Sequence, residues 1–218
     1  MLTILKAIIP ERVVELFRSP YHYALQLIAA TVTGFPAERM VVIGVTGTKG
    51  KSTVADMLFS ILTKAGHKTA LASTIRFVTP QGEEPNTFKM TMQGRGFIQY
   101  FLARALREGA THAVVEITSE GTLQHRHRFL ALNALIVTNI QKEHIERHGS
   151  FENYVAAKRA IVAELEHSAK ANRALIVNAD MKEREQFMNA RVPNKITFSQ
   201  SELASAPHVP IAGDFNRL

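Results

Sequence analysis

The sequence predicts an α/β protein whose doubly wound, mostly parallel sheet follows a short helical segment at the N-terminus. Three observations support this prediction. From residue 40 onward, apolar runs of strand length alternate with amphipathic helical patterns. The runs are continuous, which is typical of parallel strands covered on both faces. A glycine-rich turn joins the first run to a helix, as at the first turn of many doubly wound folds.

Residues 1–39 are predicted to form the helical segment, and residues 40–218 the domain that follows. We expect two helices in the segment, Leu2–Ile9 and Glu11–Thr33. An interruption of the second helix is expected at Ser19-Pro20, because proline removes a helical hydrogen bond.

The most apolar stretch of this segment, Tyr21–Phe35, is about five residues short of the roughly 20 that span a bilayer. It also contains His22 and Gln26. We therefore expect a packed or interfacial helix and no membrane span. The N-terminus has no basic stretch followed by an apolar run and a small-residue cleavage site, so no secretory signal is predicted.

The domain is expected to alternate strands and helices along the chain. The expected strands are Met40–Val45, Thr69–Thr74, His112–Ile117, Ala134–Thr138 and Ala174–Asn178, and the expected helices are Ser52–Ala65, Phe97–Glu108 and Phe151 to about Ala169. The first of these helices should bury one side, formed by Val54, Met57, Leu58, Ile61 and Leu62. Residues 80–85 are polar and predict a loop.

The charge balance favours anionic partners. The formal net charge is +7, which suits nucleotides, nucleotide-sugars, nucleic acid or an acidic membrane surface without choosing among them. Cys and Trp are both absent, which excludes a disulfide framework and a thiolate metal site. This composition suits a reducing cytoplasm, where we expect the protein to reside.

The strongest motif is the turn Gly44-Val45-Thr46-Gly47-Thr48-Lys49-Gly50-Lys51-Ser52-Thr53. A strand, a glycine-rich turn and a helix in this order bring backbone N–H groups and the positive end of the helix dipole to one concavity, which fits a polyphosphate. We expect Lys51 to contact the β and γ phosphates of ATP, and Ser52 to contact Mg²⁺. The candidate nucleotide-binding residues are Gly47, Thr48, Lys49, Gly50, Lys51, Ser52 and Thr53. The reaction type stays open, because switches, kinases, motors and ligases all use such loops.

The loop departs from the usual pattern at Val45, where glycine is common. The variant over residues 46–53 resembles the phosphate loop of the Mur ligase family, the ATP-dependent amide-forming enzymes of peptidoglycan precursor synthesis. Five further landmarks follow in the family's order: residues 116–126, Thr138-Asn139-Ile140 with Glu143-His144 and His148-Gly149, residues 154–158, residues 177–180, and residues 213–216. The run Gln124-His125-Arg126 is similar to the UDP-N-acetylmuramoyl-tripeptide synthetase branch.

The resemblance covers roughly residues 40–218 and implies the central ATPase domain of this family alone. In the family, an N-terminal domain holds the UDP-sugar and a C-terminal domain carries the incoming amino acid. We therefore expect a chain that is truncated or unusually minimal. Its sequence does not identify which amino acid is added.

The resemblance also implies metal ligands. Glu116 ends an apolar strand, where open parallel sheets place their ligand sites, and would bind Mg²⁺ with Ser52; a solvent-facing carboxylate is the alternative. His144 would bind a second Mg²⁺, helped by a carbamylated Lys158. From the local sequence alone, His144 belongs to a solvated charge run and Lys158 is an ordinary helix-face lysine. The implied catalytic residues are Lys51, His144 and Lys158, and the implied nucleotide-binding set also includes Asn139.

Four polar residues match substrate-contacting positions of the tripeptide synthetase branch: Thr91, Thr118, Gln124 and Arg126. Arg126 is suited to a phosphate or a carboxylate, because guanidinium binds both in a bidentate manner. Thr118 stands where the family has serine. A solvated basic loop is the alternative for this stretch.

The sequence thus favours an ATP-dependent acid–amino acid ligase, or its ATPase part, that acts through an acyl phosphate on a UDP-N-acetylmuramoyl-peptide and an amino acid, with ATP and Mg²⁺. A folylpolyglutamate synthase or cyanophycin-type ligase is an alternative with the same loop and mechanism. A nucleotide-binding module without ligase activity is another. A nucleic-acid-binding ATPase is disfavoured, because no recognised nucleic-acid motif accompanies the basic charge. The sequence leaves the oligomeric state open.

Overall fold

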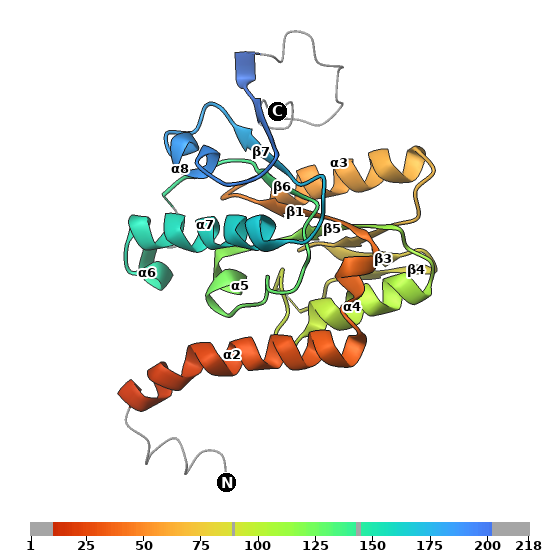
Figure 1. Ribbon diagram of the computed structural model, residues 1–218, viewed down its shortest axis with the longest axis horizontal. Coiled ribbons are helices and arrows are strands. Elements are labelled where there is room, and N and C mark those ends of the chain that lie inside the picture. Colours follow the sequence, from red (N-terminus) through yellow and green to blue (C-terminus); the bar gives the residue numbers. More distant parts are fainter. Residues whose placement is uncertain (1–10, 89, 143–144, 202–218) are drawn as a thin grey trace.

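The computed structural model describes residues 11–88, 90–142 and 145–201, and it places one sheet between two layers of helices (Figure 1). The strands are β1 (Val41–Thr46), β2 (Thr69–Ala72), β3 (Arg76–Thr79), β4 (Gly82–Pro85), β5 (His112–Glu116), β6 (Ala134–Val137), β7 (Ala174–Asn178) and β8 (Asn194–Phe198). They lie in the order β4-β3-β2-β5-β1-β6-β7-β8. All neighbouring pairs from β2 to β8 are parallel. The predicted mostly parallel α/β fold is therefore confirmed.

Both edges of the sheet differ from the sequence prediction. At one edge, the expected loop over residues 80–85 forms β4, which pairs with β3 in an antiparallel hairpin. At the other edge, β8 was not predicted at all. Every residue of β4 and most of β8 are exposed, so neither strand carries an apolar run that marks it. Gly82 and Pro85 fit β4 because an edge strand tolerates residues that a central strand does not.

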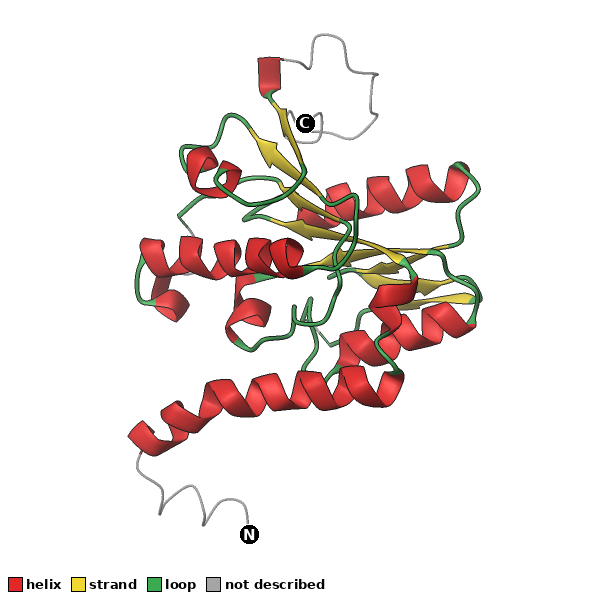
Figure 2. Cartoon of the chain, in the orientation of Figure 1, coloured by secondary structure: helices red, strands yellow, loops and turns green. Residues whose placement is uncertain are grey.

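Helices cover both faces of the sheet (Figure 2). They are α2 (Glu11–Thr33), the 3₁₀ helix η1 (Pro36–Arg39), α3 (Lys51–Lys64), α4 (Phe97–Arg107), α5 (Ser119–Leu123), α6 (Ile145–His148), α7 (Phe151–His167) and α8 (Arg184–Met188). α3 lies on one face, where Val54, Leu58 and Leu62 pack against a core that includes Val45 and Val114. α4 and α7 lie on the opposite face (Figure 1). Ile61, expected on the buried side of α3, is 63% exposed.

The N-terminal segment contributes α2, which packs along α4 through its C-terminal half (Figure 1). Ala29 and Ala30 are buried there, whereas residues 17–21 are exposed. The expected interruption at Pro20 is wrong: the helix runs through it, and surrounding water can satisfy the carbonyl that proline leaves without an N–H donor. The expected helix Leu2–Ile9 lies outside the described residues. No helix in the described ranges combines the length and apolar character needed to cross a bilayer.

The strand order places a crevice at the carboxyl end of β1. The chain leaves β1 toward β2 on one side, and β6 returns on the other side, so β1 lies between β5 and β6. Open parallel sheets bind ligands where the direction of winding reverses in this way. The loops after β1, β5 and β6 all meet at this point.

Candidate active site

The turn after β1 has a backbone that only glycine can adopt at Gly47. Its φ is +149°, and an added Cβ would lie 1.9 Å from Oγ1 of Thr138. Gly50 is the N-cap of α3 with φ +78°, again in the left-handed region. α3 then begins at Lys51, so the N–H groups of its first turn, which have no acceptor within the helix, lie at the carboxyl end of β1. This arrangement matches the predicted phosphate loop.

Asn139 fixes the loop from the β6 side. Its backbone oxygen accepts from the Thr48 N–H at 2.9 Å, and its Oδ1 accepts from the Lys49 N–H at 2.8 Å. Its Nδ2 donates to the Lys49 carbonyl oxygen at 3.0 Å, and Oγ1 of Thr138 donates to the same oxygen at 2.8 Å. The residue therefore holds the conformation of the predicted nucleotide-binding loop.

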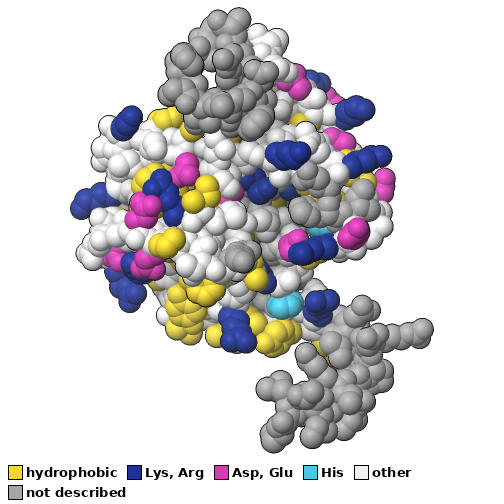
Figure 3. Space-filling model, turned by 180° about the vertical axis from the view of Figure 1, so that it is seen from behind, with side chains coloured by type: hydrophobic (Ala, Val, Ile, Leu, Met, Phe, Trp, Pro, Cys, Tyr) yellow, Lys and Arg dark blue, Asp and Glu magenta, His cyan; other side chains and the backbone are white. Residues whose placement is uncertain are grey.

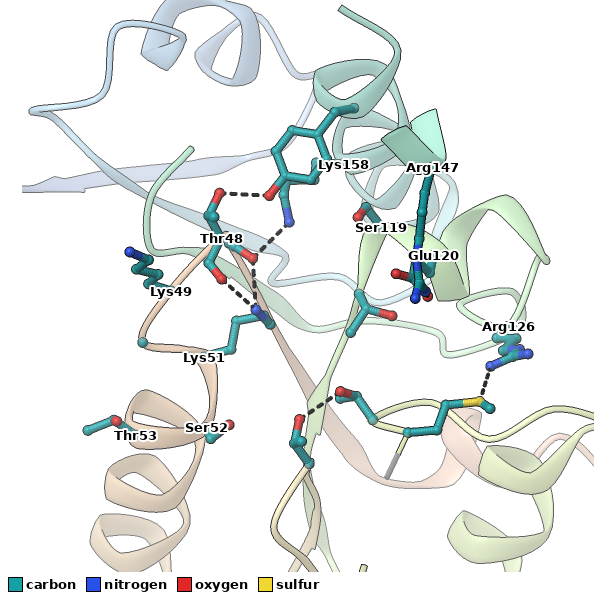
Figure 4. Close-up of a pocket in the computed structure, with 17 residues that line it drawn as sticks. Thr48, Lys49, Lys51, Ser52, Thr53, Ser119, Glu120, Arg126, Arg147 and Lys158 are labelled. Carbon is teal, nitrogen blue, oxygen red and sulfur yellow. Dashed lines mark hydrogen bonds and ion pairs between the residues drawn. The ribbon is translucent and has the colours of Figure 1, made fainter. Parts of the chain in front are cut away.

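Two lysine ammonium groups meet one carbonyl oxygen in this loop (Figure 4). Nζ of Lys51 donates to the carbonyl oxygens of Gly47 at 3.0 Å and Thr48 at 2.9 Å. Nζ of Lys158, from α7, donates to the Gly47 oxygen at 2.8 Å and lies 4.8 Å from the ring centre of Tyr154. Lys158 is only 1% exposed, so it is not the ordinary helix-face lysine that periodicity suggests. The hydroxyl of Tyr154 completes the link from α7 to the loop with a 2.7 Å hydrogen bond to Oγ1 of Thr48.

Glu116 lies beneath the loop at the end of β5 and is fully buried. One carboxylate oxygen accepts a hydrogen bond from Oγ of Ser52 at 2.8 Å, and the other accepts from the N–H of Thr74. The solvent-facing alternative for this carboxylate is therefore wrong. The described residues contain no cluster of three or more His, Asp or Glu side chains that would hold a metal alone.

The phosphate loop, Tyr154 and Lys158 border a cavity of about 490 Å³ (Figure 4). Its walls are Gly47, Thr48, Lys49, Gly50, Lys51, Ser52, Thr53, Thr74, Met90, Thr91, Thr118, Ser119, Glu120, Arg126, Arg147, Tyr154 and Lys158. The structure thus brings together most of the residues predicted from the sequence. His144 and Glu143 lie outside the described residues.

Two predicted substrate residues hold the far wall of this cavity. Oγ1 of Thr91 and Oγ1 of Thr74 share a hydrogen bond of 2.6 Å. Thr118 is the N-cap of α5, and its Oγ1 accepts from the Gly121 N–H at 3.0 Å. Both threonines line the cavity while also ordering the loops that carry them.

Arg126 and Gln124 are engaged with each other and with the opposite loop. The Arg126 guanidinium donates to Oε1 of Gln124, to the carbonyl oxygen of Met92, and to the sulfur of Met90 at 2.9 Å. Burial lowers the pKa of Arg126 from its ordinary value. Arg126 lines the cavity and Gln124 does not.

Sequence reasoning missed several residues that line the cavity, and Arg147 is the most exposed of the charged ones. Its Nη1 pairs with a carboxylate oxygen of Glu120 at 2.5 Å. Nε2 of His148 contacts Oγ of Ser119 at 3.1 Å, which holds α6 beside α5. In the sequence Arg147 belongs to the charged stretch around His144, and no local pattern marks it as a cavity residue.

A second cavity of about 1010 Å³ adjoins the loop on the β6 side. It shares Lys49, Gly50 and Thr53 with the first cavity. Its other walls combine apolar and polar side chains, including Val54, Met57, Asn139, Ile140, Phe151, Asn178, Asp180, Met181, Phe198 and Gln200. The loop therefore lies between a cationic cavity and a larger, more apolar one.

Comparison with known proteins agrees with this geometry. The model of the Mur ligase middle domain matches residues 45–212. A UDP-N-acetylmuramoyl-L-alanyl-D-glutamate–2,6-diaminopimelate ligase of Parabacteroides distasonis is 31% identical over 182 residues, which are 83% of this chain and 36% of that protein. The enzyme of the same name from Chlamydia trachomatis is 29% identical over 172 residues, 79% of this chain and 34% of that protein. The chain thus spans about a third of the length of these relatives.

Solved structures show the same fold. A UDP-N-acetylmuramoyl-L-alanyl-D-glutamate–2,6-diaminopimelate ligase superposes with a TM-score of 0.63 at 24% identity, covering 74% of this chain and 32% of that one. The folylpolyglutamate synthase of Mycobacterium tuberculosis, complexed with ADP, gives a TM-score of 0.60 at 12% identity, covering 80% and 46%. With a family model matched over most of its length and a phosphate loop built as described above, this chain belongs to the Mur ligase family and carries its middle domain.

Proposed function

We propose that the chain binds ATP with Mg²⁺ and is the ATPase part of an acid–amino acid ligase acting on a UDP-N-acetylmuramoyl-peptide in peptidoglycan precursor synthesis. One observation carries this proposal: Lys51 and Lys158 converge on the phosphate loop above the buried carboxylate of Glu116. Cationic side chains and main-chain N–H groups gathered at the start of a helix favour an anionic ligand such as a triphosphate. A reaction that consumes ATP and muramoyl-peptide belongs in the cytoplasm.

The two cavities would hold different parts of the reactants. The triphosphate would lie on the loop, at the N-terminus of α3, where helix dipole and N–H groups favour anions. The nucleoside would lie in the larger cavity, whose apolar side chains suit a base and whose Asn178 and Asp180 suit polar contacts. The acid substrate would lie in the cavity of about 490 Å³, beside Thr91, Thr118 and Arg126.

Ser52 and Glu116 fit a magnesium site. Mg²⁺ is usually held by one or two carboxylates with substrate phosphates and water, so a full cage of protein ligands is not needed. The Ser52 hydroxyl and the Glu116 carboxylate already touch at 2.8 Å beneath the loop. When bound, the metal would supply positive charge that offsets charge developing on phosphate oxygens.

Lys158 would assist a second magnesium site with His144, after carbamylation. The position of Lys158 supports this proposal, because its ammonium group and that of Lys51 repel each other where they share the Gly47 oxygen. A carbamate on Lys158 would be anionic and would therefore attract the Lys51 ammonium group.

The reaction would proceed in two transfers. A substrate carboxylate oxygen attacks the γ-phosphorus of ATP, ADP leaves, and an acyl phosphate forms. The amino group of the incoming amino acid then attacks the acyl carbon, phosphate leaves, and the nitrogen loses a proton. Lys51 and the N–H groups at the start of α3 would stabilise charge on the transferred phosphoryl group.

The direct test is ATP hydrolysis by the 218-residue chain, with and without an acid acceptor. UDP-N-acetylmuramoyl-L-alanyl-D-glutamate, named in the relatives' activity, should stimulate hydrolysis at least about tenfold, equivalent to about 1.4 kcal/mol of barrier. Stimulation by a folate acceptor instead would favour the folylpolyglutamate-synthase alternative, whose fold is also similar. If no acceptor stimulates hydrolysis, the result would favour the alternative of a nucleotide-binding module without ligase activity.

A further inference from the structure

Helices α5 and α6 form one wall of the smaller cavity. This wall carries an ion pair that lies apart from the phosphate loop. Arg147 and Glu120 pair at 2.5 Å, with side chains 67% and 40% exposed. Both line the cavity. Figure 4 shows the Arg147 side chain reaching from its helix toward Glu120 at the cavity edge, away from the lysines of the loop. An exposed pair of this kind contributes at most about 1 kcal/mol to stability.

The backbone of Arg147 is held in place although its side chain is exposed. The next residue, His148, is 7% exposed and bonds through Nε2 to Oγ of Ser119 at 3.1 Å. The carbonyl oxygen of His148 accepts from Nδ2 of Asn153, in α7, at 3.0 Å. α6 is therefore fixed between α5 and α7, and Arg147 starts from a defined position at the cavity.

Within the described residues Arg147 commits one N–H donor, to Glu120, whereas Arg126 commits three. Arg126 contacts Gln124, Met92 and Met90, and so shapes the wall. The pair between Arg147 and Glu120 uses Nη1 of the arginine, and a guanidinium has five N–H donors. Glu120 can hold one edge of the guanidinium while another edge faces an anion.

An acid substrate that ends in glutamate needs such a group. One of its two carboxylates is activated and loses its charge, and the other stays anionic throughout the reaction. The phosphate groups would occupy Lys51 and the N–H groups at the start of α3. We infer that Arg147, anchored by Glu120, binds the carboxylate that is not activated and thereby selects a dicarboxylate acceptor. This inference rests on the proposed function, whose substrate class it narrows.

The test pairs a change in the protein with a change in the ligand. Binding of UDP-N-acetylmuramoyl-L-alanyl-D-glutamate and of its two monoamides, each lacking one glutamate carboxylate, is measured by calorimetry with a non-hydrolysable ATP analogue present. The wild-type chain should bind the dicarboxylate about tenfold more tightly than one of the monoamides. Arg147→Ala should bind the dicarboxylate about tenfold more weakly than wild type and bind that monoamide equally well. Arg147→Lys should restore part of the preference.

Arg184→Ala is the matched control. Arg184 pairs with Glu185 at the same 2.5 Å distance but does not line the cavity, so its loss should leave all three affinities unchanged. Thermal melting of each variant checks that it is folded. Full preference for the dicarboxylate in Arg147→Ala, or equal weakening of all three ligands, would overturn the role of Arg147 alone. A wild-type chain that binds ATP but none of the three ligands would overturn the muramoyl-peptide assignment, and the inference with it.

Discussion

Two of the proposed site residues, Glu116 and Lys158, are buried charged side chains. Glu116 is fully buried and Lys158 is 1% exposed, although burying a charge is costly unless partners compensate. Sequence motifs marked both positions, because Glu116 ends an apolar strand and Lys158 lies in a family motif. Their burial was not predictable, since it depends on how α7 and the loop after β2 pack against the phosphate loop.

The contacts of Arg126 and Asn139 show a further limit of sequence reasoning. Both residues were expected to contact ligands, yet each organises part of the protein. Asn139 holds the loop through Thr48 and Lys49, and Arg126 ties the turn after α5 to Met90 and Met92. These contacts join segments far apart in the chain, and no local pattern reveals them.

His127 makes stability depend on pH. It is 1% exposed, and burial, with smaller effects from Arg128 and His125, lowers its pKa from 6.5 to about 3. The unfolded chain therefore binds a proton between these values that the folded chain does not. The stabilisation is complete above pH 6.5 and declines as the pH falls toward 3. We predict that, as the pH is lowered below 6.5, His127 alone decreases the free energy of unfolding, measured in urea, by up to about 1.4 kcal/mol for each pH unit.

The control is His127→Leu, which cannot titrate. Neither ring nitrogen of His127 has a hydrogen-bond partner among the described residues. The substitution therefore leaves no other buried polar group without its hydrogen bond. His22, His112 and His125 also have pKa values lowered mainly by burial, and their share of the pH dependence should persist in the variant. Parallel stability curves for wild type and variant between pH 7.5 and 5 would contradict the assignment to His127.

Among the elements, the buried strands with long apolar runs were predictable, whereas the four-residue strand β3 was not expected although most of it is buried. The central strands β1, β5, β6 and β7 are continuous apolar runs, and each was expected within one or two residues of its observed bounds. The exposed edge strands β4 and β8 and the short helices α5, α6 and α8 lack a periodic pattern. Their positions are set by neighbours in space, so sequence alone did not identify them.

The packing of α2 on α4 depends on Gly96. This glycine is the N-cap of α4, its φ is +75°, and an added Cβ would lie 2.2 Å from Cβ of Ala29 in α2. Gly96→Ala must strain the backbone and also separate the two helices. We predict a loss of about 2 to 4 kcal/mol in the free energy of unfolding, measured in urea.

Gly66→Ala separates these two effects. Gly66 has φ +89°, and an added Cβ would meet no atom within 4 Å, so this variant carries the backbone strain without a clash. It should lose only about 1 kcal/mol. Equal losses in the two variants would show that α2 does not pack tightly on Gly96.

At the scale of the whole molecule, the winding of the sheet explains where the site lies. Loops after β1, β5 and β6 meet where the winding reverses, and this position followed from the predicted fold class. On the face seen in Figure 3, Lys and Arg side chains of the described residues are interleaved with Asp and Glu. That face carries no continuous basic stripe among these residues.

The central claim is that the turn between β1 and α3 grips a triphosphate, and calorimetric titration with a non-hydrolysable ATP analogue, with and without Mg²⁺, tests it most directly. Lys51 reaches the loop from the first turn of α3, whereas Lys64 lies exposed in the last turn of the same helix. We predict Mg²⁺-dependent binding by the wild-type chain, at least about tenfold weaker binding by Lys51→Ala, and unchanged binding by Lys64→Ala. A wild-type chain that does not bind the analogue, or a folded Lys51→Ala that binds it as tightly as wild type, would contradict the claim.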